Sequence, residues 1–168
     1  MARGNGNATI VIPCCADKDL MPVKTHEDNV YYDLKAQCYI DASEPDLPTR
    51  NLRLLPGHRC LVKTGVRLQL PTGYYACILS RSELAWKGGI QVLNAPGIID
   101  KRHRTEIGVI LYNAGARGVI LKYGQKIAQL AITKTRTIHL TMITEEEFKA
   151  DTERGGGVCG GGSGSADE

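Results

Sequence analysis

One aspartate stands where a side chain could activate water. Asp100 follows the apolar pair Ile98 and Ile99, which itself follows the turn residues Pro96 and Gly97. That order predicts a carboxylate at the edge of a sheet, where it can reach a ligand from a rigid backbone. A carboxylate so placed suits a general base. Taken alone, an aspartate in a turn is more often bonded to solvent or to its own backbone, so this segment by itself favours a structural role.

A second group of residues is suited to binding phosphate. In the stretch from Arg81 to Ala85, Ser82 and Glu83 stand where a strand gives way to a short helix. Backbone amides at a helix start, a serine hydroxyl and an arginine all donate hydrogen bonds to phosphate oxygens. The alternative is a helix N-cap serine beside a surface arginine, which this motif alone favours.

The third group lies in the tail from Arg154 to Ser165, where glycine dominates. Successive glycine amides can curl around a phosphate, and the arginine adds charge and a bidentate set of donors. The composition alone is that of a flexible linker, because it has too few apolar side chains to bury. We therefore expect residues 151–168 to form a flexible arm.

Short runs of β-forming residues recur along the rest of the chain with turn residues between them. The runs that we expect to become strands are 9–14, 52–55, 60–70, 74–79, 90–93, 107–112, 119–122, 127–133 and 137–143. Many short strands of this kind predict a sandwich or barrel. The period-two alternation of Val66, Leu68 and Leu70 predicts that these side chains face the core, with the residues between them pointing outward. A short helix is expected at 82–87, and another after the capping-box sequence 144–147. The prediction is one all-β domain over residues 1–150, with one or two short helices, followed by the arm.

Composition restricts the class of protein further. The 168 residues include 21 basic and 18 acidic side chains spread along the chain, which does not indicate a nucleic-acid-binding face. The six cysteines form no Cys-x-x-Cys pair and have no histidine at the spacing of a zinc site. No segment is typical of a signal peptide or of a membrane span. We expect a soluble intracellular protein, cytoplasmic or nuclear, with neither nucleic acid nor membrane as a partner.

These groups occur together with two more motifs, in an order that resembles the trimeric deoxyuridine triphosphate nucleotidohydrolases, or dUTPases. The resemblance covers residues 30–165. Its five motifs are Tyr32-Asp33-Leu34, the stretch from Arg81 to Ala85, Gly97-Ile98-Ile99-Asp100, the stretch from Lys126 to Leu130, and the tail from Arg154. The resemblance implies a distorted jelly roll, or β-clip, that assembles as a homotrimer. Each active site would be shared between subunits, and the arm would close over the site of a neighbour.

The resemblance also implies a reaction: water attacks the α-phosphorus of dUTP, giving dUMP and pyrophosphate, with Mg²⁺ on the triphosphate. Asp100 would orient and deprotonate the water. Arg81, Ser82 and Gln129 would hold phosphate oxygens, Arg154 would clamp the terminal phosphate, and Asp33 would reach the metal through water. Glu83 stands near the phosphates where the family has a small residue.

Other positions would recognise the base and the sugar. Asn94 would face the uracil edge, with the backbone of a hairpin over residues 90–99 completing the recognition through Gly97, Ile98 and Ile99. His103 stands where the family has a tyrosine under the deoxyribose. In the arm, Cys159 replaces the phenylalanine that covers the uracil, and Gly160 follows it.

Two alternatives remain open at this point. The changes at residues 102, 103 and 159 fit a dUTPase-derived regulatory or binding protein with reduced catalysis. A dCTP deaminase shares the fold, but the asparagine before Gly97 and the presence of the fifth motif count against it.

Overall fold

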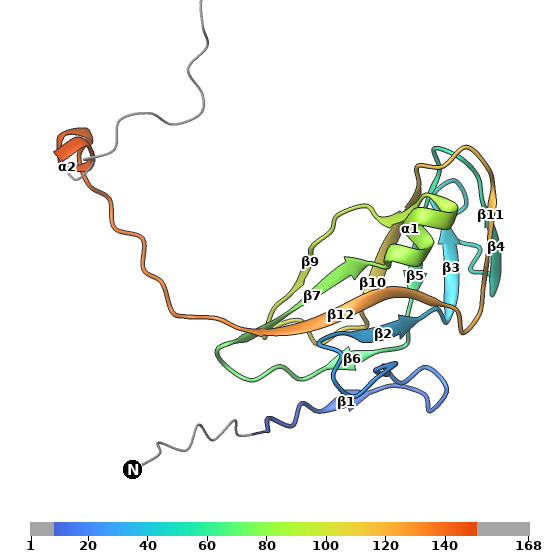
Figure 1. Ribbon diagram of the computed structural model, residues 1–168, viewed down its shortest axis with the longest axis horizontal. Coiled ribbons are helices and arrows are strands. Elements are labelled where there is room, and N and C mark those ends of the chain that lie inside the picture. The colour runs from blue at the N-terminus through green and yellow to red at the C-terminus, as the bar shows by residue number, and fades with distance from the viewer. Residues whose placement is uncertain (1–8, 151–168) are drawn as a thin grey trace, which may run out of the picture. The chain divides into compact units, whose positions relative to one another are not determined.

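The computed structural model describes residues 9–150 (Figure 1). The expectations for Arg154, Cys159 and Gly160 lie outside the described residues. The chain divides into two compact units, the first ending at Arg136 and the second beginning at Thr137, and each is described by itself.

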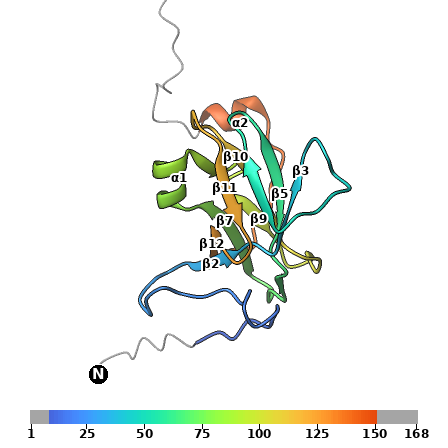
Figure 2. The ribbon, with the colours of Figure 1, turned by 90° about the vertical axis from the view of Figure 1, so that its right-hand side faces the viewer.

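The first unit is built mainly from β-strands. Its two four-stranded sheets have the orders β2-β12-β7-β9 and β3-β5-β10-β8, while β11 pairs with β4 and β1 with β6 (Figures 1 and 2). The strands are β1 (Cys14–Cys15), β2 (Tyr32–Lys35), β3 (Cys38–Asp41), β4 (Asn51–Leu54), β5 (Arg59–Lys63), β6 (Arg67–Leu68), β7 (Tyr74–Ser80), β8 (Ile90–Val92), β9 (Gly97–Ile99), β10 (Gly108–Asn113), β11 (Val119–Lys122) and β12 (Lys126–Lys134).

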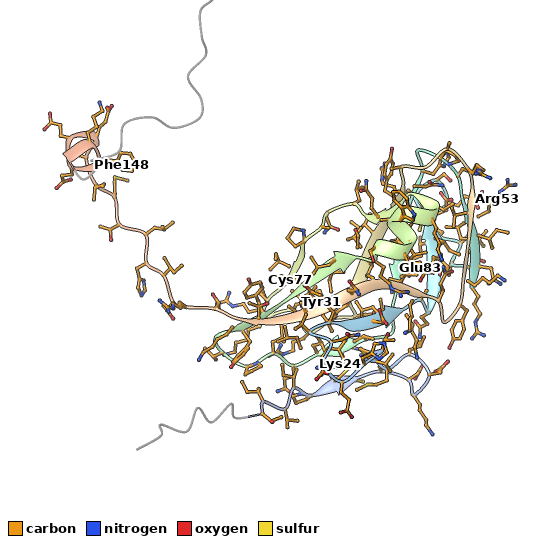
Figure 3. All side chains as sticks on the ribbon, in the orientation of Figure 1. Lys24, Tyr31, Arg53, Cys77, Glu83 and Phe148 are labelled. Atoms are coloured by element: carbon orange, nitrogen blue, oxygen red, sulfur yellow. The ribbon has the colours of Figure 1, made fainter. Side chains whose placement is uncertain are left out.

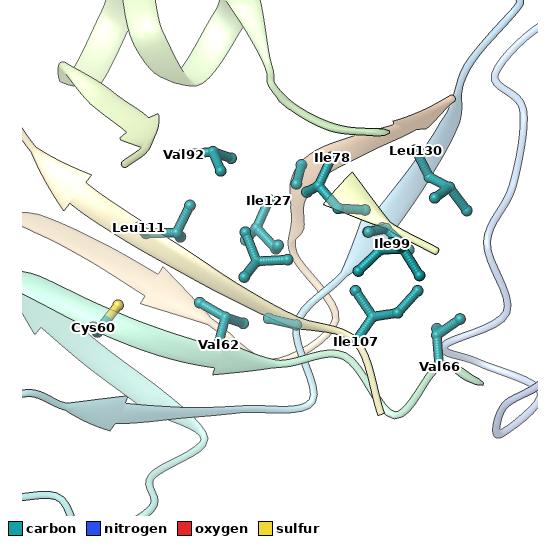
Figure 4. Close-up of a cluster of buried hydrophobic side chains, with 14 of the residues drawn as sticks. Cys60, Val62, Val66, Ile78, Val92, Ile99, Ile107, Leu111, Ile127 and Leu130 are labelled. Atoms are coloured by element: carbon teal, nitrogen blue, oxygen red, sulfur yellow. The ribbon is translucent and has the colours of Figure 1, made fainter. Parts of the chain in front are cut away.

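The two larger sheets share one apolar core. Leu34, Ile78 and Leu130 of the first sheet belong to the same buried cluster as Val62 and Leu111 of the second (Figure 4). Successive residues of a strand point to opposite faces, so each strand contributes every second side chain to this core. The predicted all-β, jelly-roll class is confirmed.

One predicted strand is divided in two. The run 60–70 becomes β5 and β6 because Gly65 adopts a φ of 70°, a left-handed conformation that interrupts a strand. A Cβ at this position would lie 3.1 Å from Leu20 Cδ1 and 3.2 Å from Gln37 Nε2, so Gly65 also permits a close approach. The alternation of Val66 and Leu68 with outward residues was predicted correctly, since both are buried.

Residues just before β2 extend the edge of the first sheet. Val23 forms an antiparallel bridge with Asp33, in which the Asp33 amide donates to the Val23 carbonyl at 2.7 Å. This bridge places Thr25 beside Asp33.

The second unit contains α2 (Glu145–Ala150). The predicted capping box is present: Thr144 Oγ1 accepts from the Glu147 amide at 3.2 Å, and Glu147 Oε2 accepts from the Thr144 amide at 2.8 Å. The strand predicted over residues 137–143 is wrong. Its apolar residues Ile138, Leu140 and Met142 are 76%, 97% and 98% exposed, and no described strand pairs with this segment. In residues 9–150, neither helix has the length and apolar character needed to cross a membrane.

Candidate active site

Asp33 lies on the face of its sheet that points away from the core. Its neighbour Leu34 is fully buried in the core, and successive strand residues alternate between faces. Asp33 pairs directly with Gln129 on β12, which pairs with Leu79 on β7. Directly paired residues share a face, so Asp33 and Gln129 lie side by side there. The fold therefore brings together two of the residues predicted from the sequence.

Three side chains converge on the Asp33 carboxylate, which is only 5% exposed. Lys126 Nζ lies 2.8 Å from Oδ2, and Thr25 Oγ1 donates to the same oxygen at 2.9 Å. Lys126 Nζ also donates to Thr25 Oγ1 at 3.0 Å. On the other side, Arg81 Nε lies 3.3 Å from Oδ1. Two cations thus surround one anion, and the group carries a net positive charge.

The pKa of Asp33 reflects this surrounding. Burial alone would raise it, but hydrogen bonds from Lys126 and Thr25 and the charge of Arg81 lower it, and the net direction is below the ordinary value. The carboxylate is therefore ionised at neutral pH in spite of its burial.

Arg81 is held from two directions. Its Nη1 donates to the Lys126 carbonyl at 2.9 Å. Its buried Nε makes no hydrogen bond within the described residues, so the contact with Asp33 is an ion pair without hydrogen-bond alignment. The alternative of an N-cap serine beside a surface arginine is wrong on both points. Arg81 itself is the N-cap residue, with extended backbone at φ −87° and ψ 126°, and its side chain is only 19% exposed.

The short helix α1 (Ser82–Gly88) follows Arg81 directly and carries Ser82 and Glu83 at its start. Both are exposed, and Glu83 forms an ion pair with Lys87 at 2.9 Å; Figure 3 shows Glu83 on this helix. A hollow beside the helix start is lined by Arg81, Glu83, Leu84, Lys87, Gln125 and Lys126. Three cations and one paired carboxylate line it, a charge distribution suited to an anion.

The hairpin predicted over residues 90–99 is wrong, because β8 and β9 belong to different sheets. β8 pairs with β10 and β9 with β7, so the chain crosses between the two sheets from Val92 to Gly97. The Val92 amide donates to Ser80 Oγ at 2.8 Å, which ties this crossing to the end of β7. Asn94 is exposed within it, and its Nδ2 would lie 3.5 Å from a Cβ added at Gly97.

Two residues of β9 have opposite surroundings. Ile99 is 8% exposed and packs in the core, whereas Ile98 is 58% exposed on the other face. Gly97 is buried opposite Ile78. Among the predicted base-reading positions, the exposed ones are therefore Asn94 and Ile98.

Asp100 lies in an exposed turn after β9 and uses one of its two oxygens to hold that turn. Its Oδ1 accepts from the backbone amides of Arg102 at 2.7 Å and His103 at 3.1 Å. Its Oδ2 accepts no hydrogen bond from any described residue. Lys101 Nζ donates to Thr72 Oγ1 at 2.6 Å, which ties the turn to the loop before β7. Asp100 is thus fixed in direction with one oxygen available.

His103 is half-buried in the same turn. Its Nε2 lies 3.4 Å from Thr105 Oγ1, and its amide is bonded to Asp100. The backbone of His103 is therefore fixed to the candidate base, while its ring faces Thr105.

The fold separates Asp100 from Arg81 within one chain. Ile99 pairs with Ala76, and Arg81 stands at the far end of β7, five residues further along. Asp100 comes one residue after Ile99 and so continues opposite Tyr75, six residues from Arg81. At about 3.3 Å per strand residue, Asp100 and Arg81 are roughly 20 Å apart along the sheet. One group of predicted residues, comprising Asp33, Arg81 and Gln129, is brought together, and Asp100 with His103 forms another.

Lys126 and Thr25 were not predicted as functional residues. Lys126 stands at the start of the fourth motif, and this position was the one signal in the sequence that could have pointed to a functional role for it. Thr25 carries no sequence signal, because it reaches Asp33 only through the bridge that Val23 makes with β2.

The fold and the two clusters define a jelly-roll protein with a cationic hollow at one end of a sheet and an exposed carboxylate at the other. The sequence model of the dUTPase family matches residues 47–163, and the chain belongs to this family. The protein is 36% identical to the deoxyuridine 5'-triphosphate nucleotidohydrolase of Clostridium novyi over 144 residues, which cover 86% of this chain and 93% of that protein. It is 45% identical to the enzyme of the same name from Anaplasma marginale over 105 residues, or 62% and 71% of the two chains.

Solved structures agree on the fold. The dUTPase from phage phi11 of S. aureus matches with a TM-score of 0.65 at 20% identity, covering 81% of this chain and 97% of that one. The dUTPase of Streptococcus mutans matches with a TM-score of 0.62 at 22% identity, covering 74% and 93%. At this level of identity the likeness establishes the shared fold and nothing beyond it.

Proposed function

We propose that this protein hydrolyses dUTP to dUMP and pyrophosphate, with Asp100 as the general base. The relatives named above carry this activity in their names. The observation that carries the proposal is that the two oxygens of the Asp100 carboxylate differ in their contacts. Oδ1 accepts two backbone hydrogen bonds that fix the side chain, and Oδ2 is free to accept a proton from water. A base held in one direction loses little freedom when it meets its substrate.

The phosphate chain would lie at the Arg81 cluster. Arg81, Ser82 and Gln129 donate hydrogen bonds to its oxygens, and the positive charge around Asp33 attracts the triphosphate. Asn94 reads the uracil edge through its amide, and His103 packs against the sugar. Arg154 would clamp the terminal phosphate, with Cys159 and Gly160 of the arm near the base.

We propose a homotrimer in which each site takes its residues from different subunits. The separation of roughly 20 Å between Asp100 and Arg81 along one sheet supports this, because it exceeds the span over which one α-phosphate could touch both residues. A neighbouring chain would bring its Asp100 turn to the Arg81 cluster.

Mg²⁺ would accompany the substrate, as the family resemblance implies, and a mutant of the phage phi11 dUTPase is described with a structural Mg(II) ion. The described residues include no group of three or more histidine, cysteine, aspartate or glutamate side chains arranged to hold a metal. Asp33, the expected contact, already has both oxygens next to cations. The described side chains therefore do not fit a metal site, and the phosphates would supply the ligands.

We place the enzyme in the cytoplasm or nucleus, which the free thiols of the five described cysteines support.

The test is incubation of the full chain with Mg²⁺ and, in turn, dUTP, dCTP, dTTP and UTP, with pyrophosphate and the nucleotide product measured. We expect pyrophosphate and dUMP from dUTP alone. Absence of pyrophosphate from dUTP would refute the proposed activity, ammonia from dCTP would identify a deaminase instead, and turnover of UTP would show that His103 does not exclude a ribose.

The shared site has its own test. Asp100→Asn and Arg81→Ala chains, each inactive alone, are co-expressed and purified together. With random mixing, about a quarter of the sites receive both intact residues if these come from different subunits. Activity near that level supports sharing, and a mixture as inactive as its components contradicts it while leaving dUTP hydrolysis untouched.

A further inference from the structure

The strongest unexplained feature is the pairing of Asp33, which is buried but bonded to two cations and a hydroxyl. In the role expected from the family resemblance, Asp33 would reach the metal through water. Its Oδ2 accepts from both Lys126 and Thr25, which uses the two lone-pair directions of that oxygen. Its Oδ1 faces Arg81. Because both oxygens already have partners, the carboxylate has little acceptor capacity left for the water shell of a hydrated ion.

Charge argues in the same direction. Asp33, Arg81 and Lys126 together carry a net charge of +1, and the ion pairs hold both cations within 3.3 Å of the carboxylate. A dication placed beside them meets two positive charges at close range, whereas a phosphate meets attraction. The cluster therefore favours an anion over a metal.

We propose that Asp33 is a positioning residue for Arg81, that Lys126 and Thr25 lock it in place, and that it does not contact Mg²⁺. This inference rests on the proposed phosphate-binding role of Arg81. The carboxylate is fixed by Lys126 and Thr25 on one oxygen, and it holds the Arg81 guanidinium with the other. The Lys126 carbonyl holds the same guanidinium through Nη1 at 2.9 Å.

Lys126 thus acts twice on Arg81, through its ammonium and through its backbone. The ammonium orients Asp33, and the carbonyl accepts from Arg81 itself. Arg81 keeps Nη2 and the second hydrogen of Nη1 without a partner among the described residues. A phosphate would accept hydrogen bonds from those donors. Their direction depends on the contacts of the guanidinium with the Asp33 carboxylate and the Lys126 carbonyl.

The first experiment compares Lys126→Met with Lys126→Arg in the full chain. Met removes the ammonium but keeps the length and the backbone carbonyl, whereas Arg restores the charge. We expect Lys126→Met to raise KM for dUTP about tenfold with kcat little changed, the signature of lost ground-state binding. Lys126→Arg should recover most of the affinity. Lys134→Met is the matched control, because Lys134 is exposed at the other end of β12 and has no ion pair within the described residues.

The second experiment asks whether Asp33 holds the metal. Mn²⁺ replaces Mg²⁺, and electron paramagnetic resonance measures its binding to wild type and Asp33→Asn in the presence of a non-hydrolysable dUTP analogue. Mn²⁺ affinity within about twofold of wild type, together with a raised dUTP KM, supports the positioning role. A Mn²⁺ affinity about tenfold weaker in Asp33→Asn, with normal behaviour of Lys126→Met, would overturn it.

The two proposals fail in different ways. A wild-type chain without dUTP hydrolysis removes the proposed function, and the analogue-binding measurement still reports on Arg81 and Asp33. If Asp33→Asn does not fold, the Lys126 series decides the question. Equal KM values for Lys126→Met and Lys134→Met would then contradict the positioning role.

Discussion

Asp33 and Asp100 both belong to motifs that the chain shares with the dUTPase family, but Asp33 is buried and Asp100 is exposed. Asp33 is buried, and its oxygens face Lys126, Thr25 and Arg81. Asp100 is exposed, and its bonds go to backbone amides of its own turn. The first carboxylate has cations beside both of its oxygens, and the second has one oxygen without a partner among the described residues. Residue type alone does not distinguish these roles, but the number of partners does.

The largest expected effect is on catalysis at Asp100. Asp100→Asn keeps Oδ1 as an acceptor for the Arg102 and His103 amides, so the turn should survive. Loss of the basic oxygen should lower kcat for dUTP by about 10²- to 10⁴-fold, the range of a general base. Pyrophosphate release at saturating dUTP measures this. Asp100→Ala serves as a comparison, since it also removes the turn contacts. Near-normal kcat in Asp100→Asn would assign the base to another residue.

The next effect is on stability at Asp33. Asp33→Asn leaves Arg81 and Lys126 without their anion, and removing one member of a buried pair is costly. We expect a loss of about 2 kcal/mol in the free energy of unfolding, below the fully buried range because Lys126 is 34% exposed. Urea unfolding monitored by circular dichroism measures it. Asp100→Asn, which leaves an exposed turn intact, should lose less than about 0.5 kcal/mol. Equal losses of unfolding free energy in Asp33→Asn and Asp100→Asn would show that the buried pairing of Asp33 does not stabilise the fold more than the exposed turn at Asp100 does.

The same contrast predicts a dependence on pH. The pKa of Asp33 is lowered in the folded state, so its contribution to stability is fully present above the unfolded pKa of about 4 and is lost as pH falls through the folded value. The difference in unfolding free energy between wild type and Asp33→Asn should therefore shrink on acidification from pH 5 toward pH 3. Thermal or urea unfolding at a series of pH values tests this. A difference that stays constant with pH would show that the charge of Asp33 is not what stabilises the fold.

The two regions also differ in how far the sequence predicted them. The order of motifs predicts a catalytic role for Asp100, which stays a prediction, whereas the period-two alternation around Val66 and Leu68 predicted the core face correctly. Lys126 and Thr25 were missed, because their role depends on the pairing of β12 and of Val23 with β2, which no local pattern encodes. The same limit explains residues 137–143. Their alternation of apolar and polar residues resembles a strand, yet a strand requires a partner, and the described chain supplies none.

The smallest expected effect lies next to the Asp33 cluster, at Glu83. This carboxylate is exposed and pairs with Lys87 one helical turn away, so its contribution to stability should be small. Its charge, however, lines the same hollow as Arg81 and Lys126 and opposes an incoming phosphate. Glu83→Gln should therefore lower KM for dUTP about two- to threefold at low salt, with less effect at high salt because exposed charges are screened. Lys87→Met should do the reverse, since it removes a cation from the hollow and leaves Glu83 unpaired. If both variants leave KM unchanged at low salt, the hollow is not where the phosphates bind, and the cluster around Asp33 would be a purely structural feature of this sheet.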